Sequence, residues 1–258
     1  MSSGSHRLRR ALRGGLTCDG QIVGTFVKLP STDVVELAVG AGFAFVVVDL
    51  EHSTLSEQDA IGLVRHAELC SIPAVVRIPR VDSALINRLL ENGAAGVQLS
   101  MLSTVAQVHA LHAATRFPPN GARSISLANR VAEYGAHGLT EFLRTEAEDP
   151  PLLVGQVETA RTEPFEKMLP GLDVCFVGTT DLSVDMGVRA GDEALRSAVS
   201  DIASAAHAAG TAFGGWAPSV IAASDFGLHA ADYLVVGSDL QILAAGLRTA
   251  ARPEADDA

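Results

Sequence analysis

Residues 43–52, FAFVVVDLEH, decide the fold and raise the question of function. The first part is a nearly unbroken apolar run rich in valine, which is typical of a strand buried on both faces of a parallel sheet. The second part places Asp49, Glu51 and His52 within four positions, directly after that strand. These groups form either an ordinary polar loop or part of a catalytic site. The ends of the other strands decide between the two interpretations.

Similar apolar runs alternate with amphipathic helical segments along most of the chain. Several helical segments end in glycine, as in LAVGAG and LLENGAAG, which is a helix stop signal. We expect strands at 21–29, 43–50, 73–78, 96–100, 152–158, 174–178, 211–216 and 233–237. Eight strand–helix units in a chain of this length predict a (β/α)₈ TIM barrel. A doubly wound open sheet is the alternative, but the chain lacks the glycine-rich phosphate turn usual after its first strand.

The chain has 258 residues, of which 48% are hydrophobic, enough for one large core. We assign residues 21–250 to a single barrel domain. Residues 1–20 are interpreted as an N-terminal extension or expression-tag remnant plus a short helix, and residues 251–258 as a polar tail. The segment 101–151 is longer than one helix needs, so we expect a loop and a further short helix that act as a lid on the catalytic face.

Charge and composition exclude several classes of function. The formal net charge of −11 argues against nucleic acid or an anionic membrane as a partner. The three cysteines are scattered and form no CxxC pair, so neither a disulfide framework nor a structural zinc site is expected. There is no secretory signal and no run of 18 apolar residues, which predicts a soluble cytoplasmic protein.

Polar groups recur where the predicted strands end. They are Asp49, Glu51 and His52 after the second strand, Arg77 at the third, Gln156 and Glu158 at the fifth, Asp181 after the sixth and Trp216 at the seventh. Side chains at the C-terminal ends of barrel strands converge on one site. This recurrence favours a catalytic site over an ordinary loop.

Glu158 and Asp181 suit a hard divalent cation, which takes one or two protein carboxylates; otherwise they are a surface glutamate and a helix-capping aspartate. The guanidinium of Arg77 suits a carboxylate or an enolate oxygen, and the alternative is a structural ion pair. His52 is a candidate general base because histidine exchanges protons near neutral pH. Arg123, in the turn PPNGAR, either reaches an anionic substrate or is a solvated arginine.

Five motifs in order, VVVDLEH, VVRIP, RFPPNGARS, QVET and VGTTDLSVDMG, resemble those of the HpcH/HpaI aldolase family. These are class II, metal-dependent pyruvate aldolases that include 4-hydroxy-2-oxoheptanedioate aldolase and 2-dehydro-3-deoxyglucarate aldolase. The resemblance covers essentially the whole chain. It implies a barrel of the phosphoenolpyruvate/pyruvate-domain type, with the C-terminal helix exchanged between subunits of a homotrimer or homohexamer.

The resemblance also implies an activity and a cofactor. The reaction would be the reversible aldol cleavage of a 4-hydroxy-2-oxo acid to pyruvate, or a related 2-oxo acid, and an aldehyde. It would proceed through a metal-stabilised enolate. Mg²⁺ or Mn²⁺ is favoured by oxygen ligands, with Co²⁺ and Zn²⁺ as alternatives. Two other functions stay open: oxaloacetate decarboxylation with enolate transfer, as in macrophomate synthase, and a non-catalytic barrel that binds a 2-oxo acid.

Individual roles follow from the matched motifs. By resemblance, Glu158 and Asp181 are the metal ligands, Arg77 contacts the 2-oxo oxygen, and His52 is a base acting through a metal-bound water, with Asp49 nearby. The matched motifs further imply a turn for the pyruvate carboxylate in the backbone of Gly178, Thr179 and Thr180, and a place beside the metal for Gln156. No Schiff-base lysine is expected; Lys28 is the nearest candidate.

The sequence departs from the family pattern at four places. Glu91 stands where the family has an aspartate that pairs with the catalytic histidine. Ser100 replaces a proline after the fourth strand, GTTDLS replaces GPADLS, and Trp216 occupies a hydrophobic position at the substrate. These departures leave the proposed metal and arginine machinery in place and bear on the choice of aldehyde.

Overall fold

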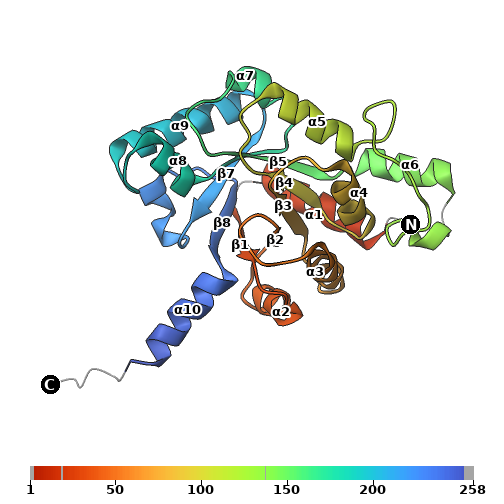
Figure 1. Cartoon of the computed structure of the whole chain (residues 1–258), viewed down its shortest axis with the longest axis horizontal. Helices are drawn as coiled ribbons and strands as arrows, with labels where there is room; N and C mark the ends of the chain where they lie inside the picture. The colour runs from red at the N-terminus through yellow and green to blue at the C-terminus, as the bar shows by residue number, and fades with distance from the viewer. Residues whose placement is uncertain (1–2, 19, 137, 253–258) are drawn as a thin grey trace.

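The computed structural model describes residues 3–18, 20–136 and 138–252. Eight parallel strands close into a barrel in sequence order, with helices around it (Figure 1). The strands are β1 (Ile22–Val27), β2 (Phe45–Asp49), β3 (Ala74–Ile78), β4 (Gly96–Leu99), β5 (Leu152–Val157), β6 (Val174–Val177), β7 (Ala212–Ala217) and β8 (Tyr233–Ser238). The predicted (β/α)₈ barrel is confirmed, and each strand lies close to its expected range.

Helices alternate with the strands along the chain, and most of them cover the outside of the barrel, whereas α10 projects away from it. They are α1 (Gly4–Thr17), α2 (Thr32–Gly40), α3 (Glu57–Leu69), α4 (Ser83–Glu91), α5 (Val105–Thr115), α6 (Leu139–Glu148), α7 (Phe165–Met168), α8 (Thr179–Met186), α9 (Glu193–Ala208) and α10 (Asp239–Ala250), with the 3₁₀ turns η1 (Glu133–Gly135) and η2 (Ile221–Phe226). Within the described part of the chain, no helix is both long enough and apolar enough to cross a membrane.

The alternation of side chains along each strand creates two hydrophobic layers. In β2, Val46 and Val48 belong to the layer between strands and helices. Phe45 and Val47 point the other way, into the barrel. Because this inward row continues to Asp49, the face that fills the barrel also carries a carboxylate to its C-terminal mouth. The strand sequence thus positions the first residue of the candidate site.

The N-terminal end of the barrel is covered by α1 rather than left open. Arg9 of this helix is fully buried and donates to Glu146 Oε1 over 2.7 Å and to the carbonyl oxygen of Ala94, just before β4. His6 and Arg123 bind the same carboxylate at 2.8 Å each. We call this end of the barrel the floor. The segment expected to be an extension or tag remnant plus a short helix therefore contains α1, which is packed as part of the fold.

The segment 101–151 contains α5, η1 and α6, as the expected helix, loop and further helix. It does not cover the mouth, however, because α5 runs from the end of β4 back toward the floor. The loop after α5 carries Arg123 to Glu146 beside α1. No residue of this segment lines the mouth pocket among the residues described. The expectation of a lid over the catalytic face was wrong.

Candidate active site

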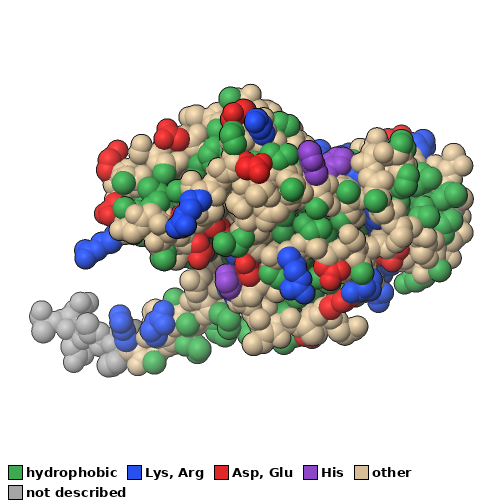
Figure 2. Space-filling view, turned by 45° about the horizontal axis from the view of Figure 1, so that its top comes forward, with side chains coloured by type: hydrophobic (Ala, Val, Ile, Leu, Met, Phe, Trp, Pro, Cys, Tyr) green, Lys and Arg blue, Asp and Glu red, His purple; other side chains and the backbone are tan. Residues whose placement is uncertain are grey.

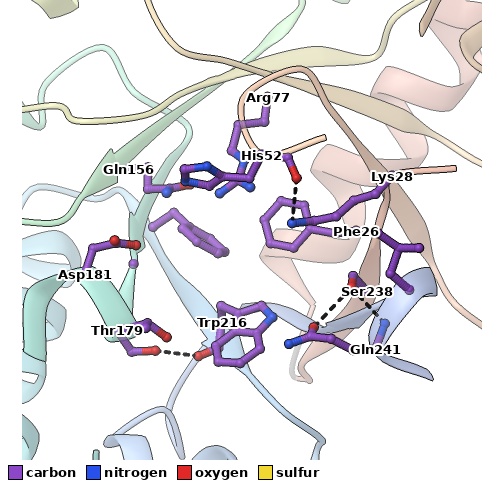
Figure 3. A pocket seen from close by; sticks show the side chains of 14 residues that line it. Phe26, Lys28, His52, Arg77, Gln156, Thr179, Asp181, Trp216, Ser238 and Gln241 are labelled. Carbon is purple, nitrogen blue, oxygen red and sulfur yellow. Dashed lines mark hydrogen bonds between the residues drawn. The ribbon is translucent and has the colours of Figure 1, made fainter. Parts of the chain in front are cut away.

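A pocket of about 330 Å³ opens at the C-terminal mouth of the barrel (Figure 3). This volume is typical of small-molecule sites. Its lining comes from seven strand ends and the start of α10: Phe26, Lys28, His52, Arg77, Gln156, Phe176, Gly178, Thr179, Thr180, Asp181, Trp216, Ser238, Leu240 and Gln241. The recurrence of polar residues at the strand ends thus marks one shared pocket.

The sheet register sets Asp49 of β2 beside Arg77 of β3. Asp49 is fully buried and accepts two hydrogen bonds from Arg77, at Nε over 2.8 Å and at Nη2 over 2.6 Å. It also accepts the backbone N–H groups of Glu51 and His52, which fixes the turn after β2. Burial would raise the pKa of Asp49, but the hydrogen bonds and charge of Arg77 outweigh it and lower the pKa to about 2. Asp49 therefore stays ionised and orients Arg77.

Arg77 is also held from one face by an aromatic ring. Its guanidinium carbon lies 4.3 Å from the centroid of the Phe26 ring, a cation–π distance. With Nε and Nη2 engaged by Asp49, Nη1 has no hydrogen-bond partner among the described residues. The arginine is thus fixed on two sides and presents one free donor group to the pocket.

A chain of buried amides leads to Glu158, directly after β5. Gln98 of β4 donates to the side-chain oxygen of Gln156, and Gln156 donates to Glu158 Oε1. Burial raises the pKa of Glu158 to about 7, with further increases from the negative charges of Glu51 and Asp181. The hydrogen bond from Gln156 opposes this shift without cancelling it. Glu158 thus faces more negative charge than its surroundings neutralise.

The acidic side of the pocket fits a divalent cation. Glu51 Oε2 is buried and has no hydrogen-bond partner in the described part of the chain; Arg77 Nε lies 3.4 Å from it and His52 Nε2 3.7 Å. The negative charges of Glu51 and Asp181 both act on Glu158 and disfavour its ionised form. A bound cation would relieve this repulsion, and carboxylate oxygens are the ligands that hard divalent ions prefer.

A second set of metal-ligand atoms lies elsewhere. Glu36 of α2 with His66 and Cys70 at the end of α3 is the one group of three potential ligands within 4.8 Å of one another among the described residues. These residues belong to the outer helices and do not line the pocket. They are not part of the candidate active site.

The turn between β6 and α8 forms another wall of the pocket. A Cβ on Gly178 would lie 2.7 Å from Glu158 Cγ, so glycine is needed for this close approach. The first turn of α8 has no side-chain cap, and its start at Gly178 lies on the pocket. Thr179 donates its hydroxyl to the carbonyl oxygen of Trp216 over 2.8 Å, which ties the turn to β7. Helix N-termini of this kind attract anions.

The structure brings most of the predicted site residues together, but not Glu91 and Arg123. His52 lies at the pocket rim with its side chain 58% exposed. Glu91 ends α4 on the way to the floor, where its carboxylate contacts Asn87. Because α4 runs from the mouth toward the floor, its last residue, Glu91, lies away from His52 at the pocket rim. The two side chains therefore cannot pair within one chain. Arg123 is buried against Glu146 and does not reach the pocket, since α5 returns the chain to the floor.

The remaining departures have local structural partners. Ser100, in place of proline, donates its hydroxyl to the carbonyl oxygen of Ile78 over 2.9 Å. Trp216 donates its indole N–H to the carbonyl oxygen of Gly237 over 3.2 Å and forms part of the pocket wall. Trp216 therefore lies at the pocket, where the sequence placed it.

Sequence reasoning missed the side of the pocket formed by β1 and β8. Lys28 follows β1, Ser238 ends β8, and Gln241 lies in the first turn of α10. The signal was the same rule that found the other residues, since Lys28 and Ser238 stand at strand ends. A single lysine or serine there resembles an ordinary surface residue, whereas DLEH is a dense polar cluster.

Comparison with known proteins shows to which family the chain is related. The family model described as HpcH/HpaI aldolase/citrate lyase matches residues 22–245. The hydroxypyruvate/pyruvate aldolase of Paraburkholderia phytofirmans is 32% identical over 226 residues, which cover 85% of this chain and 84% of that protein. The 4-hydroxy-2-oxovalerate aldolase of Rhodococcus jostii is 30% identical over 257 residues, covering 95% and 94%.

The fold comparison agrees with the sequence comparison. A crystal structure of an HpcH/HpaI aldolase/citrate lyase family protein from Burkholderia cenocepacia has a TM-score of 0.83 and 27% identity, covering 95% of this chain and 97% of that one. The class II aldolases of this family generally depend on a divalent metal ion. With its family match extending over the whole barrel, the chain belongs to the HpcH/HpaI aldolase/citrate lyase family and is an aldolase-type carbon–carbon lyase.

Proposed function

We propose that this protein cleaves a 4-hydroxy-2-oxo acid reversibly into pyruvate and an aldehyde, with a divalent cation as cofactor. The observation that carries the proposal is the juxtaposition of unbalanced carboxylates with a fixed arginine. The pKa of Glu158, directly after β5, is raised to about 7 by burial and by the charges of Glu51 and Asp181, and Asp181 and Arg77 both line the pocket. Such an arrangement suits a reaction in which negative charge develops on the substrate.

Glu158 and Asp181 are the residues that would hold the cation, with Gln156 beside them. When bound, the cation supplies positive charge that polarises the 2-oxo group and stabilises an enolate. We propose Mg²⁺ or Mn²⁺ because the available ligands are oxygens; Co²⁺ and Zn²⁺ are the alternatives. In this proposal the carboxylates bind the cofactor, and the other polar groups of the site bind the substrate.

Two elements of the chain would bind the 2-oxo acid directly. Arg77 Nη1, which has no partner among residues 3–18, 20–136 and 138–252, donates to the 2-oxo oxygen while Asp49 holds the guanidinium in place. The backbone N–H groups at the start of α8, around Thr179 and Thr180, receive the carboxylate. These contacts fix both ends of the pyruvate half before the carbon–carbon bond breaks.

His52 is the proposed base for the aldol step. Its imidazole lies at the pocket rim, where it can take the proton from the 4-hydroxyl group as the bond breaks and return it during condensation. Replacement by alanine is expected to slow aldol cleavage more than the decarboxylation of oxaloacetate, since only cleavage removes a hydroxyl proton. Since Glu91 lies toward the floor, a His52–Glu91 pair can form only between two chains.

The decisive experiment is proton NMR of pyruvate in D₂O. We expect loss of the methyl signal with Mg²⁺ or Mn²⁺ and no loss after EDTA treatment. Arg77→Ala should slow the exchange by about 10²–10³-fold, the usual effect of removing an oxyanion donor. Arg80→Ala, an exposed arginine three positions later, is the matched control and should exchange like the wild type. Exchange that persists in EDTA, or that Arg77→Ala leaves intact, contradicts the proposal.

We further propose that the protein is a homo-oligomer, a trimer or hexamer, in which α10 is exchanged between subunits. Only Asp239 of this helix is buried, and Leu240, Ile242, Leu243 and Leu247 are exposed. The helix stands away from the barrel in Figure 1, and Figure 2 shows hydrophobic side chains on its open surface. An apolar face of this kind is normally covered.

Gel filtration with light scattering tests the oligomer. We expect a mass of three or six chains for the wild type and smaller species for Leu243→Glu/Leu247→Glu. Leu69→Glu on α3, a leucine of similar exposure, is the control and should leave the mass unchanged. A monomeric wild type would dismiss this part of the proposal.

A further inference from the structure

Away from the pocket, three side chains of different chemistry meet between two outer helices. They are Glu36 of α2 with His66 and Cys70 at the end of α3, and one potential ligand atom of each lies within 4.8 Å of the other two. We propose that these three residues bind a zinc ion, at a site separate from the cation of the candidate active site.

The end of α3 supplies two of the ligands from one helix face. His66 lies in the last turn, and Cys70 follows four positions later as the C-cap residue. The backbone N–H of Cys70 donates to the carbonyl oxygen of His66 over 2.9 Å, so the helical hydrogen bonding continues to the cysteine. Residues four positions apart on a helix are neighbours on its surface. The imidazole and the thiol therefore lie one above the other.

The third ligand comes from the neighbouring helix. α2 and α3 contact each other on the outside of the barrel (Figure 1). Val35, next to Glu36, and Ala67, next to His66, are both buried in the core. These contacts anchor the two helices on either side of the site. Glu36 Oε1 then lies 2.9 Å from His66 Nε2, so the ligands are already assembled by rigid elements.

The separations suit a tetrahedral zinc ion. Zinc bonds of about 2.0–2.1 Å to nitrogen or oxygen and about 2.3 Å to sulfur place ligand atoms about 3.3–3.6 Å apart. The shortest contact here is 2.9 Å and every pair lies within 4.8 Å, so small side-chain rotations reach bonding distance. The side chains of Glu36 and His66 are 61% and 24% exposed, which leaves them room to turn and the ion a path from solvent.

The types of ligand favour zinc over the cation proposed for the mouth. Zinc binds thiolate, imidazole and carboxylate ligands, whereas Mg²⁺ takes oxygen ligands. Cys70 is a free cysteine, and its sulfur has no hydrogen-bond partner among the described residues. Partial burial and the charge of Glu36 raise the pKa of this thiol. On binding, the thiol proton passes to solvent, and the two charges of the ion balance the thiolate and the carboxylate.

Three protein ligands leave the fourth position of the ion to a water molecule. None of the three residues lines the pocket, and the end of α3 points toward the floor. The ion would therefore tie α2 to α3 and stabilise the fold without touching the chemistry at the mouth. The cysteine spacing did not predict this site, because Glu36 and His66 are 30 positions apart and meet only once the two helices pack.

The alternative is an ordinary surface ion pair between Glu36 and His66, in which Cys70 has no part. The test therefore reports on the sulfur, with Co²⁺ as a coloured substitute for Zn²⁺. We expect one equivalent of Co²⁺ to produce a thiolate-to-cobalt charge-transfer band in the near ultraviolet, and Zn²⁺ to remove it by displacement. Cobalt bound at the mouth would give no such band, since no cysteine lines the pocket among the described residues.

Cys70→Ser should abolish the band, and His66→Gln and Glu36→Gln should each weaken Co²⁺ binding by about tenfold or more. The controls are Cys18→Ser and His109→Gln, at exposed residues outside the group, which should bind Co²⁺ like the wild type. Zn²⁺ at about a hundred times its Kd should raise the melting temperature of the wild type by about 5–10 °C more than that of Cys70→Ser.

A wild type without the band, or a band that Cys70→Ser retains, overturns the zinc site. Pyruvate proton exchange with Mg²⁺, measured in the same variants, keeps this result apart from the proposed function. All three variants should exchange like the wild type, which also shows that they fold. If Cys70→Ser and His66→Gln lose the band and the exchange together, the cation is not in a separate site and the proposal fails.

Discussion

Two buried glutamates, one at each end of the barrel, have nearly the same exposure and opposite electrostatics. Glu146 at the floor is 4% exposed and Glu158 at the mouth 5%. Burial alone would raise both pKa values. At the floor, Arg9, His6 and Arg123 outweigh burial and hold the pKa of Glu146 well below its usual range. At the mouth, Glu51 and Asp181 add to burial, and the pKa of Glu158 rises to about 7.

The difference separates a structural charge cluster from a functional one. At the floor each oxygen of Glu146 has cationic donors at 2.7–2.8 Å, so the cluster is complete without a ligand. At the mouth, Glu51 and Asp181 add negative charge around Glu158, and Glu51 Oε2 has no hydrogen-bond partner within the described part of the chain. Negative charge that the fold leaves unbalanced is available to a cation. Three experiments test this contrast.

The largest effect is expected from Glu158→Gln. Losing a ligand of the proposed cation should lower metal-dependent pyruvate exchange by roughly a thousandfold, since such a cation contributes several kcal/mol to the transition state. The melting temperature without metal should not fall, because the change removes a carboxylate that its neighbours repel. Glu166→Gln, at an exposed glutamate on α7, is the control. Exchange within a few-fold of wild type would show that Glu158 holds no cation.

Glu146→Gln should have the reverse effect: it should lower the stability of the protein rather than its pyruvate exchange. It leaves Arg9, His6 and Arg123 buried around a neutral group, and breaking a buried ion pair costs about 3–5 kcal/mol of unfolding free energy. Urea unfolding measures the loss. Glu148→Gln on the same helix, whose exposed pair with Arg144 should contribute less than about 1 kcal/mol, is the matched control. If both variants unfold alike, the floor cluster is not structural.

The third effect is smaller and depends on pH. The pKa of Glu158 is raised from 4.5 to about 7 in the folded protein, so the folded state binds a proton that the unfolded chain releases. The resulting stability is complete below pH 4.5 and is lost as pH rises through about 7, amounting to about 3 kcal/mol at most. Denaturation in EDTA at pH 5 and pH 8 should show it, and Glu158→Gln should not.

Asp49, at the same end of the barrel, has its pKa shifted in the opposite direction from that of Glu158. Its pKa is lowered from 3.8 to about 2, so its contribution is present above pH 3.8 and is lost only as pH falls through about 2. Stability that rises between pH 5 and pH 8 in the metal-free protein would contradict the assignment of Glu158. Added Mg²⁺ should bind more tightly above pH 7, where Glu158 is ionised.

The sequence predicted the strands well because each is a short apolar run bounded by turn residues, a local pattern. It predicted the acidic end of the pocket because DLEH and QVET place several polar groups together at strand ends. It did not reveal the floor, because Arg9 and Glu146 are 137 positions apart and their pairing depends on the closed barrel. Arg123 was misplaced for the same reason: its turn looks exposed until α1 covers it.

Lys28 illustrates a different limit. Its strand and its place at the strand end could be read from the sequence, but a lone lysine has no neighbours there to mark it as functional. Its position is fixed by a residue more than 200 positions later, Asp239 at the start of α10, which accepts its backbone N–H. Residues that act together can be recognised from the sequence only when they lie close to one another along the chain.

Helix α10 joins two regions that are otherwise far apart. Its first turn carries Leu240 and Gln241 to the pocket, while Leu247 stands exposed toward its other end. A helix of 12 residues extends about 18 Å and transmits a displacement at one end to the other. The same helix thus carries residues of the pocket at one end and an exposed apolar face toward the other. In the proposed oligomer, a subunit that covered this face would also touch the element that forms part of the pocket wall.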